Sequence, residues 1–487
     1  MLTSCRAPQP DQPARRRWRR AFFFLSTAAA AALAATAFVH TPTAQGVTTL
    51  RIGAAALSGG PQTGMPAIAR TLTDEYLVAL DPNGRPSPRL AQEWKHSDDG
   101  RTWRFRLARR AKFHDGSSAD ARTLAPLLAA AVRNPQFLQI HPGLQNVEAV
   151  VADGPLTIVV RMQRPRVLLI DELADLSLSL DRVGGSLGPF IVASVTAQEL
   201  HASAFRDYFR GAPQLEKITY QTYRTLRAAW SALMRDEVDA LYEVTRDAYE
   251  FVTSESRVRT YSFLRPYVST VLFNVARRPL TEPSVRRALS HSISRQAIVA
   301  GAYRGRGQAA DGPVLLEHWT LAGGLAAAPL YNPALADQIL AGLPLSVGRD
   351  QMPSRVRFTC LVAPSIELQP FERVALLLQQ QFYSRGIDMQ IEAVSLAEMQ
   401  RRILTGDFDA ALLEFFGKSP SWLSAFWHSR PPALGGLVGS GYSAADSELD
   451  AMQLAKDEDE LKRSIAAVYK KMHDDPPAIF IAWPEVT

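Results

Sequence analysis

The alternation of apolar and polar positions is clearest over residues 266–303. Residues 267–275 are rich in Val, Thr, Tyr and Phe, which is typical of a buried strand. A turn marked by prolines follows, and Ser284 then stands where the N-cap of a helix belongs. The next apolar positions recur at helical spacing, which predicts a helix packed on a core: Val285, Ala288, Leu289, Ser292 and Ile293. The charged residues between them are expected at the surface: Arg286, Arg287 and Arg295.

Two further patterns indicate a mixed α/β protein. Strict alternation over residues 102–107 predicts a strand with Trp103, Phe105 and Leu107 on one face. Residues 355–416 alternate between apolar strand-like runs and amphipathic helical stretches, in the order strand, helix, strand, helix, strand. That order predicts a parallel sheet covered by helices on both faces.

Two stretches resemble the same known family. Residues 76–116 contain the strings LAQEW, SDDGRTW and KFHDG, and residues 272–299 read LFNVARRPLTEPSVRRALSHSISRQAIV. Both are similar to segments of the extracytoplasmic solute-binding proteins of ABC importers, in the oligopeptide, dipeptide and nickel class known as family 5. In that class the second segment follows the point where the chain crosses between two lobes.

The resemblance implies an α/β protein with the two-lobed periplasmic binding protein fold (class II type, cluster C) and a β-rich insertion subdomain in the first lobe. The expected boundaries are residues 47–66, 185–266 and 474–487 for the first lobe, 67–184 for the insertion and 267–473 for the second lobe. The implied function is capture of a small peptide-like or other polar or acidic solute in a closable cleft. The implied partners are that solute and an ABC permease, and the protein is expected to be a monomer.

The first 46 residues have the layout of an export signal. Five arginines between residues 15 and 20 directly precede the apolar run 21–39, and the small-x-small sequence at 44–46 is a cleavage site for a signal peptidase. An uncleaved anchor is the alternative, and the paired arginines also resemble a twin-arginine signal. Cys5 precedes the apolar run, so it cannot be a lipoprotein cysteine. A soluble periplasmic protein is expected.

The export segment also accounts for most of the net charge. Residues 1–46 carry six Arg and one Asp, or +5, so the +6 of the whole chain falls to about +1 without them. Nothing in this balance favours nucleic acid or an acidic membrane as a partner.

The candidate ligand site follows the last strand of the predicted parallel sheet, because ligands of open α/β sheets bind at the carboxyl ends of strands. Residues 414–422 read EFFGKSPSW. In peptide-binding members of the family this place carries an aspartate that pairs with the ligand's amino terminus, and Lys418 aligns with it. A lysine there repels an ammonium and attracts an acidic group. The predicted ligand-binding residues are Ser58, Phe415, Phe416, Lys418, Ser419 and Trp422.

Alternatives remain open at this site. Lys418 could point to solvent, or the alignment of this loop with the family could be shifted by one residue. The aromatic residues could equally belong to the core. Tyr267 and Asn274 are the expected hinge residues, since strand 267–275 follows the crossing between the lobes.

No catalytic, metal or cofactor site is predicted. His114 and Asp115 are expected in a turn, where an aspartate accepts backbone N–H groups. Residues 184–188 have the G-x-S-x-G form of a hydrolase nucleophile elbow, with Ser186 at its centre. A secreted serine hydrolase is therefore one alternative, and a degenerate binding protein acting as a sensor is another. Cys360 is the single cysteine after the export segment, so it has no disulfide partner within the chain.

Overall fold

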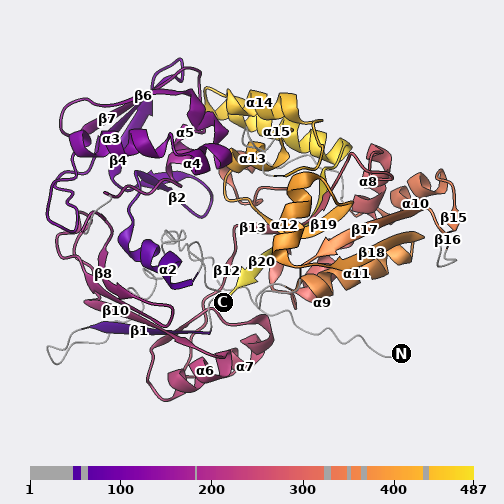
Figure 1. Cartoon of the computed structure of the whole chain (residues 1–487), viewed down its shortest axis with the longest axis horizontal. Coiled ribbons are helices and arrows are strands. Elements are labelled where there is room, and N and C mark those ends of the chain that lie inside the picture. The colour runs from indigo at the N-terminus through magenta and orange to yellow at the C-terminus, as the bar shows by residue number, and fades with distance from the viewer. Residues whose placement is uncertain are drawn as a thin grey trace, which may run out of the picture.

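The computed structural model describes residues 48–55, 64–180, 184–322, 331–347, 353–363, 370–430 and 438–487. It forms two lobes that lie side by side, with an additional subdomain above the first lobe in the view of Figure 1. The predicted export segment and Ser58 lie outside the described residues. Within those residues, no helix combines the length and apolar character that crossing a bilayer requires.

The first lobe is built on a five-stranded sheet of order β11-β1-β10-β9-β8. Its β1 runs parallel to β10 and β11, whereas β8, β9 and β10 are antiparallel neighbours. The strands are β1 (Thr49–Ala55), β8 (Phe190–Val195), β9 (Glu199–Ala204), β10 (Lys217–Tyr223) and β11 (Ala240–Tyr242). The helices are α2 (Gly64–Thr73), α6 (Leu226–Met234), η2 (Arg246–Ala248) and α7 (Tyr249–Thr253).

The insertion subdomain is an antiparallel four-stranded sheet of order β4-β5-β7-β6 with helices on its inner face. Trp103, Phe105 and Leu107 are buried, which confirms the predicted alternation in β5. The strands of this sheet are β4 (Ala91–His96), β5 (Thr102–Leu107), β6 (Val147–Ala152) and β7 (Thr157–Met162), and β2 (Val78–Leu80) and β3 (Pro86–Pro88) pair separately. Its helices are α3 (Ala121–Ala131), α4 (Pro135–Ile140), η1 (Pro142–Asn146) and α5 (Leu169–Leu173).

The second lobe contains a seven-stranded mixed sheet in which β17 runs parallel to β18 and β19, as predicted. Its strands are β12 (Phe263–Leu264), β13 (Tyr267–Phe273), β14 (Gly307–Ala309), β17 (Val356–Val362), β18 (Ile387–Ala393), β19 (Ala410–Phe416) and β20 (Ala478–Val486); β15 (Ser346–Val347) and β16 (Pro353–Ser354) pair separately. Its helices are α8 (Pro283–His291), α9 (Arg295–Ala302), η3 (Trp319–Leu321), α10 (Pro333–Ala341), α11 (Phe371–Tyr383), α12 (Leu396–Thr405), η4 (Pro420–Trp422), α13 (Leu423–Trp427), α14 (Asp446–Gln453) and α15 (Glu458–Asp474).

The packing differs from the predicted boundaries at two places. Helix α2 buries Met65, Ile68 and Leu72 against the first-lobe sheet, so the insertion begins after α2 and not at residue 67. Strand β20 pairs with β13, β12 and β14 in the second-lobe sheet, although residues 474–487 were expected in the first lobe. Figure 1 shows the yellow β20 beside β12 at the junction of the lobes.

The helical stretch after β13 is also different from the prediction. It is divided into two helices, α8 and α9. Helix α8 starts at Pro283 with Glu282 as its N-cap residue, so Ser284 lies inside the helix and is not its cap. Ser294 is the N-cap of α9, where its hydroxyl accepts a hydrogen bond from the Ala297 N–H. The apolar stripe is buried as predicted.

Two arginines expected at the surface are buried instead. Arg286 donates hydrogen bonds to the carbonyl oxygens of Pro476 and Leu280 and pairs with Asp475. Arg295 donates to the carbonyl oxygen of Phe480, 2.6 Å away. Both guanidinium groups therefore tie the helices to β20 and to the segment just before it, which the amphipathic pattern of α8 alone could not reveal.

Candidate functional site

The loop that follows β19 meets the insertion subdomain. Residues 417–419 lead from β19 into η4 and α13, and α5 of the insertion faces them. The Ser419 hydroxyl donates a 2.6 Å hydrogen bond to Asp171 Oδ2, and both side chains are buried. The same hydroxyl oxygen accepts a bond from the Ser421 N–H at the start of η4. The contact joins residues from different lobes, so it depends on the lobes being together.

A second contact lies beside the first. Trp422 Nε1 donates to Asp175 Oδ2 over 3.0 Å, and His141 Nε2 lies 3.2 Å from the same oxygen. The His141 ring is fully buried and stands edge-on to the Trp422 ring, with centroids 5.3 Å apart. Asp175 therefore connects an aromatic residue of the second lobe to a histidine of its own subdomain.

The pKa values of the two carboxyl groups, Asp171 and Asp175, are shifted in opposite directions. Burial raises the pKa of Asp171 to about 7, although the Ser419 bond and the charge of Lys418 oppose the rise. Burial also raises the pKa of Asp175, but the His141 contact, Lys418 and the Trp422 bond outweigh it, so this pKa lies below its ordinary value. Lys418 is half-buried, and its charge acts to lower the pKa of both carboxyl groups.

A row of aromatic rings continues from this contact towards the crossing between the lobes. Phe416 stands edge-on between Trp422 and Tyr267, with centroid distances of 4.6 and 5.2 Å. The Arg265 guanidinium lies over the Tyr267 ring, 4.9 Å from its centroid, and its Nη1 is 3.3 Å from Glu414 Oε2. Burial raises the pKa of Glu414 to about 7 against the nearby arginine charges. The row thus has apolar faces with charged groups at both ends.

The remaining predicted residues lie elsewhere. Phe415 is buried and packs against Phe426 and Trp427, so its ring serves the core, as the alternative interpretation had it. Asn274 donates to the carbonyl oxygens of Gly406 and Phe408, and its bonds stay within the second lobe. Its role as a hinge stays a prediction, as does that of Tyr267 at the start of β13.

The model of the bacterial extracellular solute-binding proteins, family 5, matches residues 85–433. The chain belongs to this family. It is the substrate-binding component that works with an ABC permease, and it is not an enzyme.

Known family 5 proteins resemble the chain over most of its length. The glutathione-binding protein GsiB of Pectobacterium atrosepticum is 23% identical, covering 89% of this chain and 88% of that protein. The probable D,D-dipeptide-binding periplasmic protein DdpA of Escherichia coli is 25% identical, covering 74% of this chain and 72% of DdpA. The structure of NikA from Brucella suis in complex with Fe(III)-EDTA aligns with a TM-score of 0.75 and 17% identity, covering 90% of this chain and 94% of NikA. These relatives confirm the two-lobed fold.

The hydrolase alternative is wrong for this family 5 protein. Residues 184–188 lead into β8, a strand, whereas a nucleophile elbow must lead into a helix. The backbone of this loop pairs with the turn at His114 and Asp115, through the carbonyl oxygens of Ser186 and Gly184. Asp115 Oδ1 accepts bonds from the Ser117 N–H and hydroxyl, as expected for a turn. Among the described residues, no group of three or more His, Cys, Asp or Glu is placed to hold a metal ion.

Sequence reasoning missed three members of the site: His141, Asp171 and Asp175. They lie far from Ser419 and Trp422 along the chain, and no local motif marks them. The one available signal is a pair of carboxylates beside an apolar stretch, Asp171 within α5 and Asp175 just after the helix ends at Leu173. That signal indicates a contact without indicating its partner.

Proposed function

We propose that this family 5 protein captures a peptide-like or other polar solute whose acidic or neutral polar end faces Lys418. The observation that carries the proposal is the position of Lys418. It follows β19 at the strand's carboxyl end, half-buried, at the loop where the lobes meet. An ammonium group placed there would be repelled by a partly desolvated like charge, which costs several kcal/mol in an interface.

The surroundings of Lys418 support a solute with both polar and flat apolar parts. Phe416 and Trp422, whose rings stand edge-on 4.6 Å apart, precede and follow Lys418 along the chain. Asp175, ionised and held by His141, competes with the solute for Lys418, so a solute carboxylate must bring further contacts of its own. The relative that binds glutathione, an acidic peptide, is consistent with this solute class.

A thermal-shift screen tests the solute class. Peptides, glutathione, opine-like acids and chelated metals are compared, because a ligand that binds the folded state raises its stability by RT ln(1 + [L]/Kd), or about 2.7 kcal/mol at 100 Kd. The best ligand is then titrated into Lys418→Asp and into Lys95→Asp, a control at an exposed lysine of β4. We expect Lys418→Asp to lose acidic ligands and the control to keep them. An unchanged ligand preference in Lys418→Asp would refute the proposal.

The protein acts outside the cytoplasm, and we propose that residues 1–46 direct its export and are removed. The supporting observations are the arginine cluster, the apolar run and the small-x-small sequence at 44–46. Mass spectrometry of the protein from the cell envelope should find a new N-terminus near residue 47. Replacing Arg19 and Arg20 by lysine distinguishes the two export routes, since the twin-arginine route requires the pair. Light scattering of the purified protein should find a monomer.

A further inference from the structure

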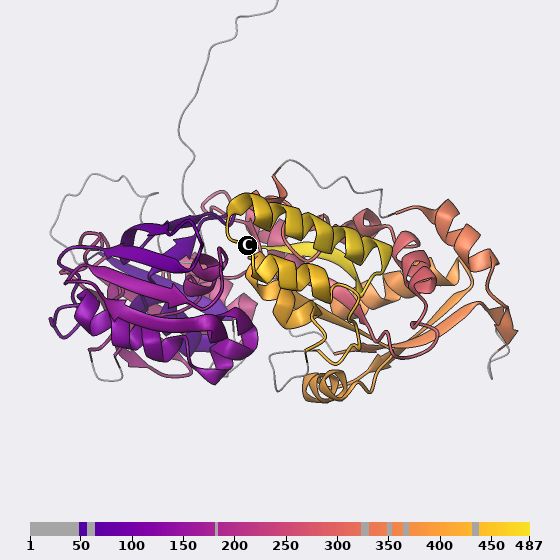
Figure 2. The ribbon, with the colours of Figure 1, turned by 90° about the horizontal axis from the view of Figure 1, so that it is seen from above.

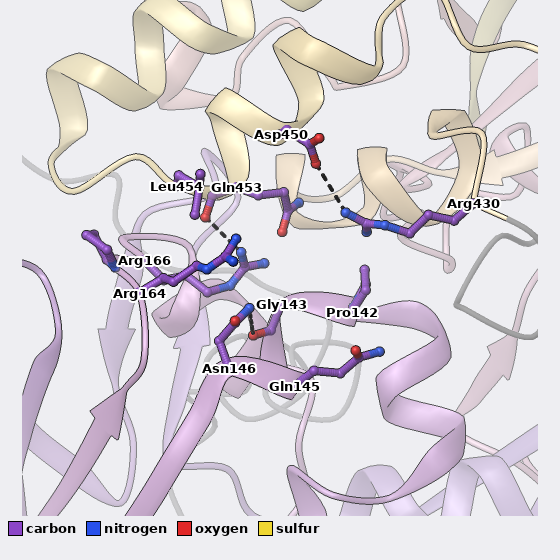
Figure 3. A pocket seen from close by; sticks show the side chains of 11 residues that line it. Pro142, Gly143, Gln145, Asn146, Arg164, Arg166, Arg430, Asp450, Gln453 and Leu454 are labelled. Atoms are coloured by element: carbon purple, nitrogen blue, oxygen red, sulfur yellow. Dashed lines mark hydrogen bonds and ion pairs between the residues drawn. The ribbon is translucent and has the colours of Figure 1, made fainter.

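A cavity of about 360 Å³ lies between the insertion subdomain and the second lobe. We call it the seam cavity. One wall is η1 and residues 164–166, and the other is Arg430 with the C-terminal end of α14. Figure 3 shows the side chains of both walls turned towards a common space. Its lining shares no residue with the candidate ligand site, so it is a separate feature.

One arginine of the cavity is built into the wall. Arg166 is 2% exposed, pairs with Glu172 through Nε and Nη2, and donates from Nη1 to the Gln453 carbonyl oxygen over 2.9 Å. Gly143 permits this position, because a Cβ there would overlap the guanidinium. The bonds use three N–H groups and leave the others for a ligand. The guanidinium is therefore fixed in place before any ligand arrives.

Two further arginines, Arg430 and Arg164, bring positive charge to the same space. Arg430, from the second lobe, is 3.2 Å from Asp450 through Nη2, and its other guanidinium N–H groups bond no residue that the structure describes. Arg164, from the insertion subdomain, is exposed and makes no hydrogen bond or ion pair with any described residue. The lining thus holds three arginines against one carboxylate, Asp450, and Glu172 offsets one charge from behind.

We propose that the seam cavity binds a small oxyanion, a phosphate or a carboxylate, and that the bound anion holds the insertion subdomain and the second lobe together. Planar guanidinium groups match oxyanions in two-point contacts. The amides of Gln145 and Asn146 line the same space. Asn146 Nδ2 donates one N–H to the Gly143 carbonyl oxygen, and its second N–H and those of Gln145 add donors. Because the arginines come from both sides, an anion between them binds the closed arrangement better than an open one, and it shifts the population towards closure.

Calorimetric titration of the purified protein with inorganic phosphate and with citrate tests the proposal, at ionic strength matched with sodium chloride. The two probes separate a phosphate from a carboxylate preference. The variants are Arg164→Gln and Arg430→Gln, and Arg122→Gln is the control at an exposed arginine of α3 outside the cavity. Arg166 is left intact, since its loss would strand buried Glu172.

We expect at least one probe to bind the wild type and the control equally. Each cavity variant should bind it about tenfold more weakly, the effect of one lost charged hydrogen bond. Small-angle scattering should show a smaller radius of gyration with that probe than with chloride alone. No binding beyond chloride, equal binding by the cavity variants, or binding without compaction would each overturn the proposal.

Discussion

Replacing Ser419 by alanine should open the protein in the absence of solute. The change removes the 2.6 Å hydrogen bond to Asp171, which joins the lobes through two buried side chains. At about pH 8, above the raised pKa of Asp171, the carboxyl is mostly ionised. A hydrogen bond to a charged group contributes about 2 kcal/mol, so the ratio of closed to open molecules should there fall roughly thirtyfold. The lost N-terminal cap of η4 affects both conformations alike and cancels from this ratio.

Ser421→Ala is the matched control for this change. Ser421 lies on the same turn and is fully buried, and its hydroxyl has no hydrogen-bond partner among the described residues. Removing it should leave the lobes as they are. Any difference between the two variants then belongs to the bond with Asp171 and not to the loss of a hydroxyl from η4.

Energy transfer between two dyes measures the ratio directly. Gln136→Cys in the insertion subdomain and Gln380→Cys in α11 give exposed labelling sites in the two lobes. Protein without residues 1–46 lacks Cys5, and buried Cys360 stays unlabelled. Equal transfer efficiency in Ser419→Ala and Ser421→Ala would refute the reasoning, because the contact would then contribute nothing to closure.

Three other predictions follow from the structure. The closed fraction should rise as the pH falls from about 7 to about 4, because burial in the closed form raises the pKa of Asp171 from 3.8 to about 7, so the closed form binds an extra proton. Energy transfer measured across this range should show the free energy of closure changing by up to about 1.4 kcal/mol per pH unit. Asp171→Asn should abolish this pH dependence. Arg286→Leu should reduce the free energy of unfolding, measured by urea denaturation, by about 3–5 kcal/mol, because it leaves buried carbonyl oxygens and Asp475 without their partner. The neighbouring Arg287→Leu, at a partly exposed position, should change it by less than about 0.5 kcal/mol, and equal losses in the two variants would contradict the prediction. Cys360 should resist thiol reagents until the protein unfolds, because burial raises its pKa to about 12, and rapid labelling of folded protein would disprove this.

The sequence predicted the elements whose pattern is local. The alternation of Trp103, Phe105 and Leu107 and the strand–helix order of residues 355–416 depend only on neighbours along the chain, and both are confirmed. Arg286 and Arg295 were misjudged for a related reason. Charge alone assigns an arginine to the surface, and only the strand that arrives from far along the chain supplies the carbonyl oxygens that bury it.

The sequence predicted only one of the two sides of the candidate site. The loop holding Lys418, Ser419 and Trp422 follows a strong strand, and rules for α/β sheets point to such places. Its partners Asp171 and Asp175 come from a separate subdomain, and nothing along the chain specifies how that subdomain docks. Contacts of this kind are fixed by the packing of whole lobes, which lies beyond any pattern in a single segment.

The position of β20 has a consequence for how the protein is made. Strand β20 lies between β12 and β13 in the sheet, yet nearly all of the second lobe is synthesised between β13 and β20. Until β20 emerges, one edge of β13 is unpaired, and Arg295 lacks the Phe480 carbonyl oxygen that accepts its hydrogen bond. The second lobe therefore completes its core only once β20 is available, and until then β13 presents an unpaired apolar strand edge of the kind that promotes aggregation.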